Sequence, residues 1–154
     1  MTETDLEELI DVDLISLDEP PAEKEAVIEH LLDLAVEAGR VSDREQALED
    51  LLAREEESTT GVGMGIGIPH AKTTGVEEPT LAFTRSSEGV DFDAMDGEPA
   101  TLFFMILVPE ESSDDHLEIL SSISRSLVHE ETREKLHEAE SAEAVQRLII
   151  EEVA

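Results

Sequence analysis

The sequence contains no cysteine, no tryptophan and no tyrosine, and it has few basic residues. Without cysteine the chain can form no disulfide, no thiolate metal site and no thiol nucleophile. Ten Lys and Arg stand against forty Asp and Glu, which gives a formal net charge of −30. No basic patch is therefore available to neutralise phosphates, and we expect no nucleic-acid partner.

Long apolar runs are missing as well. No run approaches the roughly 18 residues that a membrane-spanning helix needs, and the N-terminal residues are acidic, unlike those of a signal peptide. The sequence therefore predicts a cytoplasmic protein with no direct membrane insertion.

The acidic residues are spread along the helical segments and are not gathered in one tail. Repulsion among them destabilises a compact chain in dilute salt, whereas molar salt shortens the Debye length to about 3 Å. Apolar residues make up 40% of the chain at regular spacing, which argues against a disordered acidic polypeptide. We interpret the surface as adapted to a halophilic cytoplasm.

With 154 residues the chain is long enough for one domain with a real core. The strongest strand pattern is the apolar run TLFFMILV at 101–108, which lies between two prolines and predicts a strand buried on both faces. Further strands are expected at 12–17 and 80–84. Helices are expected at 4–10, from 22 to Gly39 and at 130–138. Three more helices are expected to begin at a Ser42–Glu45 capping box, after the candidate caps Ser112, Ser113 and Asp114, and after Ser141. This alternation predicts an α/β sandwich, a single domain with a mixed central sheet and helices on both faces.

A glycine-rich stretch, GVGMGIGIPHAK at 61–72, has glycine at every second position before Pro69 and His70. Such a stretch predicts a sharp turn or a close approach to the backbone. Pro69 is expected to stop a strand at Ile68 and to leave His70 at the strand's end, facing a bare, glycine-lined surface. A neutral imidazole placed there could serve as a nucleophile or as an acid and base. The alternative is a loop histidine without a role, and the stretch matches neither a dinucleotide fingerprint nor a P-loop.

Two more residues are candidates for a site. His116 falls in the first turn of an expected helix, where the helix dipole favours neutral imidazole, although it could equally be a surface histidine. Arg54 lies near a helix end just before the glycine stretch, where it could also serve only the last carbonyls of the helix. We interpret His30, His129 and His137 as solvated surface residues.

These residues occur in an ordered set: Arg54-Glu55, Ser58-Thr59, Gly61 and Ile66-Gly67-Ile68-Pro69-His70. The set resembles the active-site signature of the fructose/mannitol-type enzyme IIA (EIIA) domain of the bacterial phosphoenolpyruvate-dependent sugar phosphotransferase system (PTS). The resemblance covers about Leu9 to Glu151 and implies one type-2 EIIA domain over 1–154. Gly63, Gly65 and the extreme acidity depart from the family pattern.

The resemblance implies roles for three residues. His70 is similar in position to the phosphorylated histidine of the family, His116 to its second active-site histidine and Arg54 to the arginine that supports the phosphoryl group. It implies a phosphotransferase that accepts phosphate from phospho-HPr and passes it to a cysteine of enzyme IIB, with the membrane component IIC involved indirectly. Fructose is the favoured sugar, and no metal or organic cofactor is implied.

Two other functions stay open at this point. A regulatory protein of the nitrogen-related EIIA type would also accept phosphate on His70, but it would act by binding transporters or kinases. A domain of the same fold that has lost phosphotransfer would only bind partners, and it would not need Arg54, His70 and His116 together.

Overall fold

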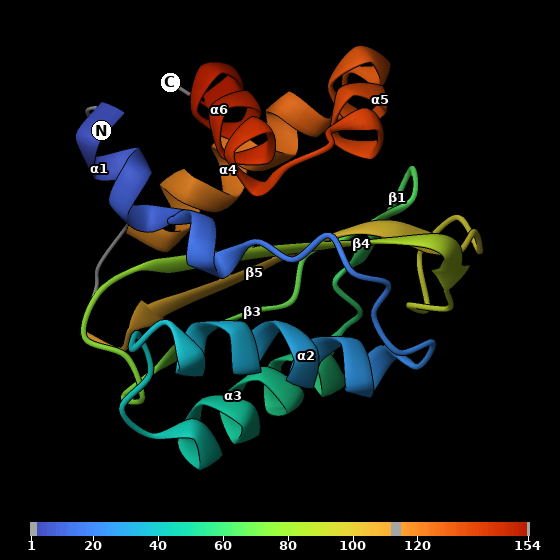
Figure 1. The fold of residues 1–154 in the computed structure, drawn as a ribbon. Coiled ribbons are helices and arrows are strands. Elements are labelled where there is room, and N and C mark those ends of the chain that lie inside the picture. The colour runs from blue at the N-terminus through green and yellow to red at the C-terminus, as the bar shows by residue number, and fades with distance from the viewer. Residues whose placement is uncertain (1–2, 112–114, 154) are drawn as a thin grey trace.

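The structure is a computed structural model that describes residues 3–111 and 115–153, except for the side chains of 3–5, 115–117, 119, 120 and 153. It is a sandwich of three layers, with a mixed sheet between two layers of helices (Figure 1). One face is covered by α2 (Lys24–Glu37) and α3 (Arg44–Glu57), and the other by α1 (Glu3–Leu9), α4 (Asp115–Leu127), α5 (Glu130–Glu138) and α6 (Ala142–Val153). The expected α/β architecture is therefore confirmed.

The sheet is built around β5 (Ala100–Pro109), the strand expected at 101–108, which is buried along nearly all of its length. The other strands are β1 (Gly61–Gly63), β2 (Ile66–Gly67), β3 (His70–Thr73) and β4 (Thr80–Val90). On one side β5 pairs in parallel with β2 and β3, and on the other side it pairs antiparallel with β4. The short strand β1 pairs antiparallel with β2 at the sheet's edge.

The two short strands β2 and β3 keep the same register against β5. Ile66 lies opposite Leu102 and His70 lies opposite Ile106, so the pairing resumes in phase after Pro69. Proline has no N–H to donate, but the Pro69 carbonyl oxygen still accepts from the Ile106 N–H at 3.0 Å. The expectation that His70 ends a strand is therefore wrong, because His70 begins β3.

Alternate side chains of β5 enter two separate cores. Phe104, on the face covered by α4, α5 and α6, packs edge-on against Phe83 with ring centroids 5.1 Å apart. Phe103, on the α2 and α3 face, lies 5.3 Å from Phe92. All four phenylalanines of the chain are thus buried as two pairs, one on each side of the sheet, within otherwise aliphatic cores.

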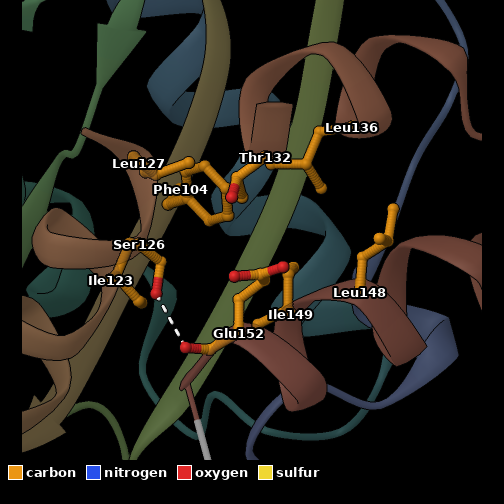
Figure 2. A pocket seen from close by; sticks show the side chains of 9 residues that line it. All are labelled: Phe104, Ile123, Ser126, Leu127, Thr132, Leu136, Leu148, Ile149 and Glu152. Atoms are coloured by element: carbon orange, nitrogen blue, oxygen red, sulfur yellow. Dashed lines mark hydrogen bonds between the residues drawn. The ribbon is translucent and has the colours of Figure 1, made fainter. Parts of the chain in front are cut away.

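The three C-terminal helices meet over β5 in an apolar layer. Figure 2 shows the side chains that converge there: Phe104, Ile123, Leu127, Thr132, Leu136, Leu148 and Ile149. The nearly buried hydroxyl of Ser126, on α4, donates to the carbonyl oxygen of Glu152 at 3.0 Å (Figure 2). This bond ties the last turn of α6 to α4.

The strand expected at 12–17 is wrong. Val12–Leu14 form a single 3-10 turn, η1, in which the Asp11 side chain accepts from the Asp13 N–H at 3.0 Å. Of this segment, Ile15 forms an isolated parallel bridge with Phe83. The apolar alternation is real, but Asp11 and Asp13 favour a capped turn over a ladder.

The capping box at the start of α3 is also wrong, although the helix is present. Its N-cap is Asp43, which accepts from the Gln46 N–H at 3.1 Å. The Ser42 hydroxyl donates instead to the carbonyl oxygen of Gly75 at 3.2 Å, beside the bridge between Val41 and Val76. Ser42, which the local sequence pattern predicts as the N-cap, thus makes a tertiary contact, and Asp43 caps the helix.

The remaining expectations are largely confirmed. Gly39 follows α2 with φ +76°, α5 spans 130–138, and the Ser141 hydroxyl oxygen accepts from the Ala144 N–H at 3.1 Å. β4 extends past 84 to Val90, and a turn forms at Asp96-Gly97. The candidate caps at 112–114 lie outside the described residues. Within the described part of the chain, no helix combines the length and the apolar character needed to cross a membrane.

Candidate functional site

An open pocket of about 310 Å³ lies between the C-terminal half of α3 and the start of β3. α3 contributes Asp50, Ala53, Arg54 and Glu57, and β3 contributes His70, Ala71 and Lys72. The structure therefore brings together two of the three residues singled out from the sequence, His70 and Arg54. Both side chains are half-buried, so each is held by the protein while still reaching the pocket.

The ring of His70 is fixed by a hydrogen bond from Nδ1 to the carbonyl oxygen of Ile68, at 2.7 Å. A carbonyl oxygen can only accept, so Nδ1 carries the proton and donates it. In neutral His70 the lone pair then resides on Nε2, the ring nitrogen farther from the backbone. The structure thus selects one tautomer of the histidine.

Arg54 lies in the last turn of α3, and its Nη1 donates to the carbonyl oxygen of Ser58 at 3.0 Å. A cation at a helix C-terminus also interacts favourably with the helix dipole. This bond confirms that Arg54 serves a backbone carbonyl near the helix end, and the same side chain lines the His70 pocket.

The turn after α3 is held by a carboxylate to which the sequence analysis gave no role. Glu55 Oε2 accepts from the Thr60 N–H at 2.7 Å, and Oε1 accepts from the Thr60 hydroxyl at 2.5 Å. The Thr59 hydroxyl donates to the carbonyl oxygen of Phe92 at 2.7 Å. These bonds anchor the turn both to α3 and to the segment after β4.

The glycine stretch forms a tight hairpin, as expected, in which Met64 adopts φ +58° between β1 and β2. The expectation of a bare surface is wrong, because Gly61, Gly63 and Gly67 are buried. A Cβ on Gly67 would lie 3.1 Å from the Phe92 ring. That glycine makes room for the protein's own core and not for a partner's surface.

Lys72 is a second cation at the pocket that sequence reasoning missed. It follows His70 by two residues on the same strand, and this spacing places both side chains on one face. The signal was therefore present once His70 was assigned to a strand. His116 belongs to α4 by its backbone, while its side chain lies outside the described part.

The other histidines lie apart from these pocket residues. His129 and His137 are exposed, which confirms their surface assignment, and the His137 ring contacts the Thr101 hydroxyl at 3.1 Å. Loss of solvation and the nearby charge of Arg85 lower the pKa of His137. For His30 the assignment is wrong, because its Nε2 is shielded from solvent and has no hydrogen-bond partner among the described residues.

Comparison with protein families places this geometry in context. Residues 8–152 match the model of the family described as "Phosphoenolpyruvate-dependent sugar phosphotransferase system, EIIA 2". The chain belongs to this family. It is a phosphotransfer component of the EIIA type, and the resemblance noted in the sequence is confirmed.

Individual relatives agree with this membership. The chain is 63% identical over 153 residues to the "PTS system fructose-specific EIIA component" of Haloferax volcanii, covering 99% of both chains. Its structure superposes with a TM-score of 0.81 on nitrogen regulatory protein IIA-Ntr from Neisseria meningitidis, at 36% identity, covering 92% of this chain and 97% of the other. It also superposes with a TM-score of 0.76 on a structure described as a complex of enzyme IIAMTL and phosphorylated enzyme IIBMTL from Escherichia coli, at 25% identity, covering 89% and 94%.

Proposed function

We propose that this EIIA protein is a covalent phosphoryl carrier of the fructose type, with His70 as the phosphorylated residue. The observation that carries the proposal is the pocket that both His70 and Arg54 line, with the His70 ring fixed through Nδ1. The 63% identity to the fructose-specific component of Haloferax volcanii supports fructose as the sugar. We infer that residues of about 9–151 form the core of this single EIIA domain.

The tautomer of His70 assigns the reacting atom. Because Nδ1–H donates to Ile68, the nucleophile is the lone pair on Nε2. A bond from Nε2 to phosphorus forms in line as the bond to the donor's imidazole nitrogen breaks. The donor ring leaves neutral when its other nitrogen is protonated, and the positive charge gained by His70 is stabilised by the bond from Nδ1–H to Ile68.

The charge on the transferred group needs cationic donors. Arg54 offers a planar, permanently charged fork that matches phosphoryl oxygens, and Lys72 adds a second positive charge at the same pocket. The resemblance gives His116 the role of a further hydrogen-bond donor near the phosphoryl group. No metal or organic cofactor enters this scheme.

The partners follow from the family. We propose HPr as the phosphoryl donor and a cysteine of enzyme IIB as the acceptor, with membrane component IIC acting only through IIB. The structural similarity to an enzyme IIA that forms a complex with phosphorylated enzyme IIB supports the second partner. This transfer would take place in the cytoplasm.

Intact mass spectrometry after incubation with phosphoenolpyruvate, enzyme I and HPr in molar salt tests the proposal. Wild type is expected to gain one acid-labile phosphoryl group, and His70→Ala none. His129→Ala, which changes an exposed histidine at the start of α5, is the matched control and is expected to be phosphorylated like wild type. Folded wild type that gains no phosphate would overturn the proposal.

A second candidate function is a regulatory role of the nitrogen type, favoured by the superposition on IIA-Ntr with a TM-score of 0.81. Such a protein would accept phosphate on His70 but would not pass it to enzyme IIB. Phosphorylated protein mixed with a fructose-type enzyme IIB distinguishes the two, because the carrier loses its phosphoryl group within minutes while the regulator keeps it.

A further inference from the structure

The carboxylate of Glu55 is held by three donors in a nearly buried position. Thr60 supplies its N–H at 2.7 Å and its hydroxyl at 2.5 Å, and Lys24 Nζ lies 3.0 Å from Oε2. The Glu55 side chain is 9% exposed and that of Lys24 is 19% exposed. A carboxylate bonded in this way has one orientation, because any rotation would leave a shielded charge without its donors.

Thr60 is in turn bonded to the short segment between β2 and β3 that leads to His70. Its carbonyl oxygen accepts from the Ile68 N–H at 2.9 Å, and the Ile68 carbonyl oxygen accepts from His70 Nδ1 at 2.7 Å. Glu55 therefore fixes Thr60, Thr60 fixes Ile68, and Ile68 fixes the His70 ring. The four residues form an unbroken series of hydrogen bonds from α3 to the imidazole.

The series transmits position and not charge. The N–H and the C=O of Thr60 belong to different peptide groups separated by its Cα atom, and the same holds for Ile68. Polarisation by the Glu55 carboxylate is therefore interrupted twice before it reaches His70. What remains is geometry, because each bond restricts where the next donor or acceptor can lie.

Lys24 gives the series its second anchor, from the start of α2. Its Nζ lies 3.3 Å from Asp93 Oδ2 and 5.1 Å from the centroid of the Phe92 ring. The Phe92 carbonyl oxygen accepts from the Thr59 hydroxyl, so the same segment holds the turn from the other side. Ordering the turn thus depends on α2, α3 and the 91–99 loop together.

We propose that Glu55 is a positioning residue for His70, which sets the histidine's tautomer and ring orientation through Thr60 and Ile68. Its effect on phosphoryl transfer rests on the proposed function of His70. Its effect on the tautomer does not, and can be measured in the unphosphorylated protein.

Nitrogen-15 NMR of the imidazole rings in molar salt, with His70 assigned by comparison with His70→Gln, provides the test. Wild type is expected to show the Nδ1–H tautomer. Glu55→Ala is expected to show a mixture of tautomers and a rate of phosphoryl acceptance lower by about tenfold or more, since small misplacements of reacting groups are costly. Glu56→Ala, at the neighbouring exposed glutamate of α3, is the control and is expected to match wild type.

Glu55→Gln separates positioning from charge. Its amide oxygen can accept from the Thr60 N–H, and its NH₂ can donate to the Thr60 hydroxyl oxygen, so the geometry survives without the charge. We expect the wild-type tautomer and a rate within about threefold of wild type. A tautomer and rate as disturbed as in Glu55→Ala would overturn the positioning role, as would a wild-type tautomer in Glu55→Ala.

Should Glu55→Ala fail to fold, Thr60→Val removes only the hydroxyl bond and keeps the side-chain shape. It is expected to shift the tautomer population in the same direction by a smaller amount, and an unchanged population would overturn the inference. If the tautomer of His70 depends on Glu55 but wild type accepts no phosphate, the proposed function is contradicted and the positioning role is not. If wild type is phosphorylated but replacing Glu55 leaves the tautomer unchanged, the positioning role is contradicted and the proposed function is not.

Discussion

Arg54 Nη1 donates to the carbonyl oxygen of Ser58 at 3.0 Å, so the cation that lines the His70 pocket also holds the end of α3. The bond restricts the guanidinium before any substrate arrives. Little rotamer entropy is then left to lose when its remaining donors meet a phosphoryl group. The same contact makes the residue sensitive to replacement even by another cation.

We expect Arg54→Lys to lower the rate of phosphoryl acceptance by about 10- to 100-fold, because lysine keeps the charge but loses the planar fork. Rapid-quench mixing with phospho-HPr, read by intact mass, measures the rate. Arg125→Lys, on α4 with a bond to the Ser122 hydroxyl, is the matched control and should keep the wild-type rate. Equal rates for the two variants would contradict a role for the fork.

We expect Gly67→Ala to destabilise the fold by about 1–3 kcal/mol through overpacking. A Cβ there would lie 3.1 Å from the Phe92 ring and 3.2 Å from Phe103. Urea unfolding in molar salt gives the free energy. The double variant Gly67→Ala/Phe92→Leu should recover part of the loss relative to the sum of the single variants. Simple additivity would show that the new methyl group does not meet the ring.

The lowered pKa of His137 predicts a stability that depends on pH. Desolvation of the ring, followed by the charge of Arg85, keeps His137 neutral in the native state at pH values where it would bind a proton when unfolded. More protons are then bound by the unfolded chain, so the free energy of unfolding decreases as the pH falls below the ordinary value of 6.5. Above that value both states are neutral and the contribution vanishes.

His137→Gln removes this titration while leaving a side chain that can bond to Thr101. Urea unfolding between pH 7.5 and 5.5 at fixed salt should therefore show that the free energy of unfolding of the variant rises relative to that of wild type as the pH falls. Arg85→Gln should weaken the same dependence, since it removes the second cause. A difference between wild type and His137→Gln that stays constant over this range would contradict the prediction.

Stability is expected to rise with salt, because the net charge of −30 repels itself until ions screen it. Lowering KCl from 2 M to 0.1 M should reduce Tm by about 10 °C, which corresponds to roughly 3 kcal/mol for a chain of this size. Replacing exposed Glu49, Glu134 and Glu138 by glutamine should flatten this dependence. A Tm that does not change with KCl concentration would contradict the prediction, because it would show that repulsion among the acidic residues does not destabilise the fold.

The strands and helices that the sequence predicts best are those with a local signal. The run at 101–108 is apolar except for Thr101 and lies between Pro99 and Pro109, and α5 begins and ends where its pattern does. β3 has no such signal, because a half-exposed HAKT segment becomes a strand only through parallel pairing with β5. The N-cap of α3 was ambiguous, since Ser42 and Asp43 each have a suitable partner three residues later.

The site divides in the same way. The ordered motif around His70 was sufficient to propose Arg54 as its neighbour. Lys72 was not predicted, because its place beside His70 depends on β3, which forms only through parallel pairing with β5. The bond between Glu55 and Thr60 could not be predicted, because it depends on how sharply the chain turns after α3. The packing of the Phe92 ring over Gly67 could not be predicted either, because the two residues are 25 apart in sequence and are brought together only by the complete sheet.

The central place of β5 also determines when a growing chain can fold on the ribosome. β2, β3 and β4 each pair with β5, and side chains of β5 pack in both cores. Until residue 109 has left the exit tunnel, the segments made earlier have no common strand on which to pair. The first two thirds of the polypeptide therefore stay unfolded until β5 is complete. Because this part of the chain is acidic, we expect repulsion between neighbouring nascent chains to oppose their association during that delay.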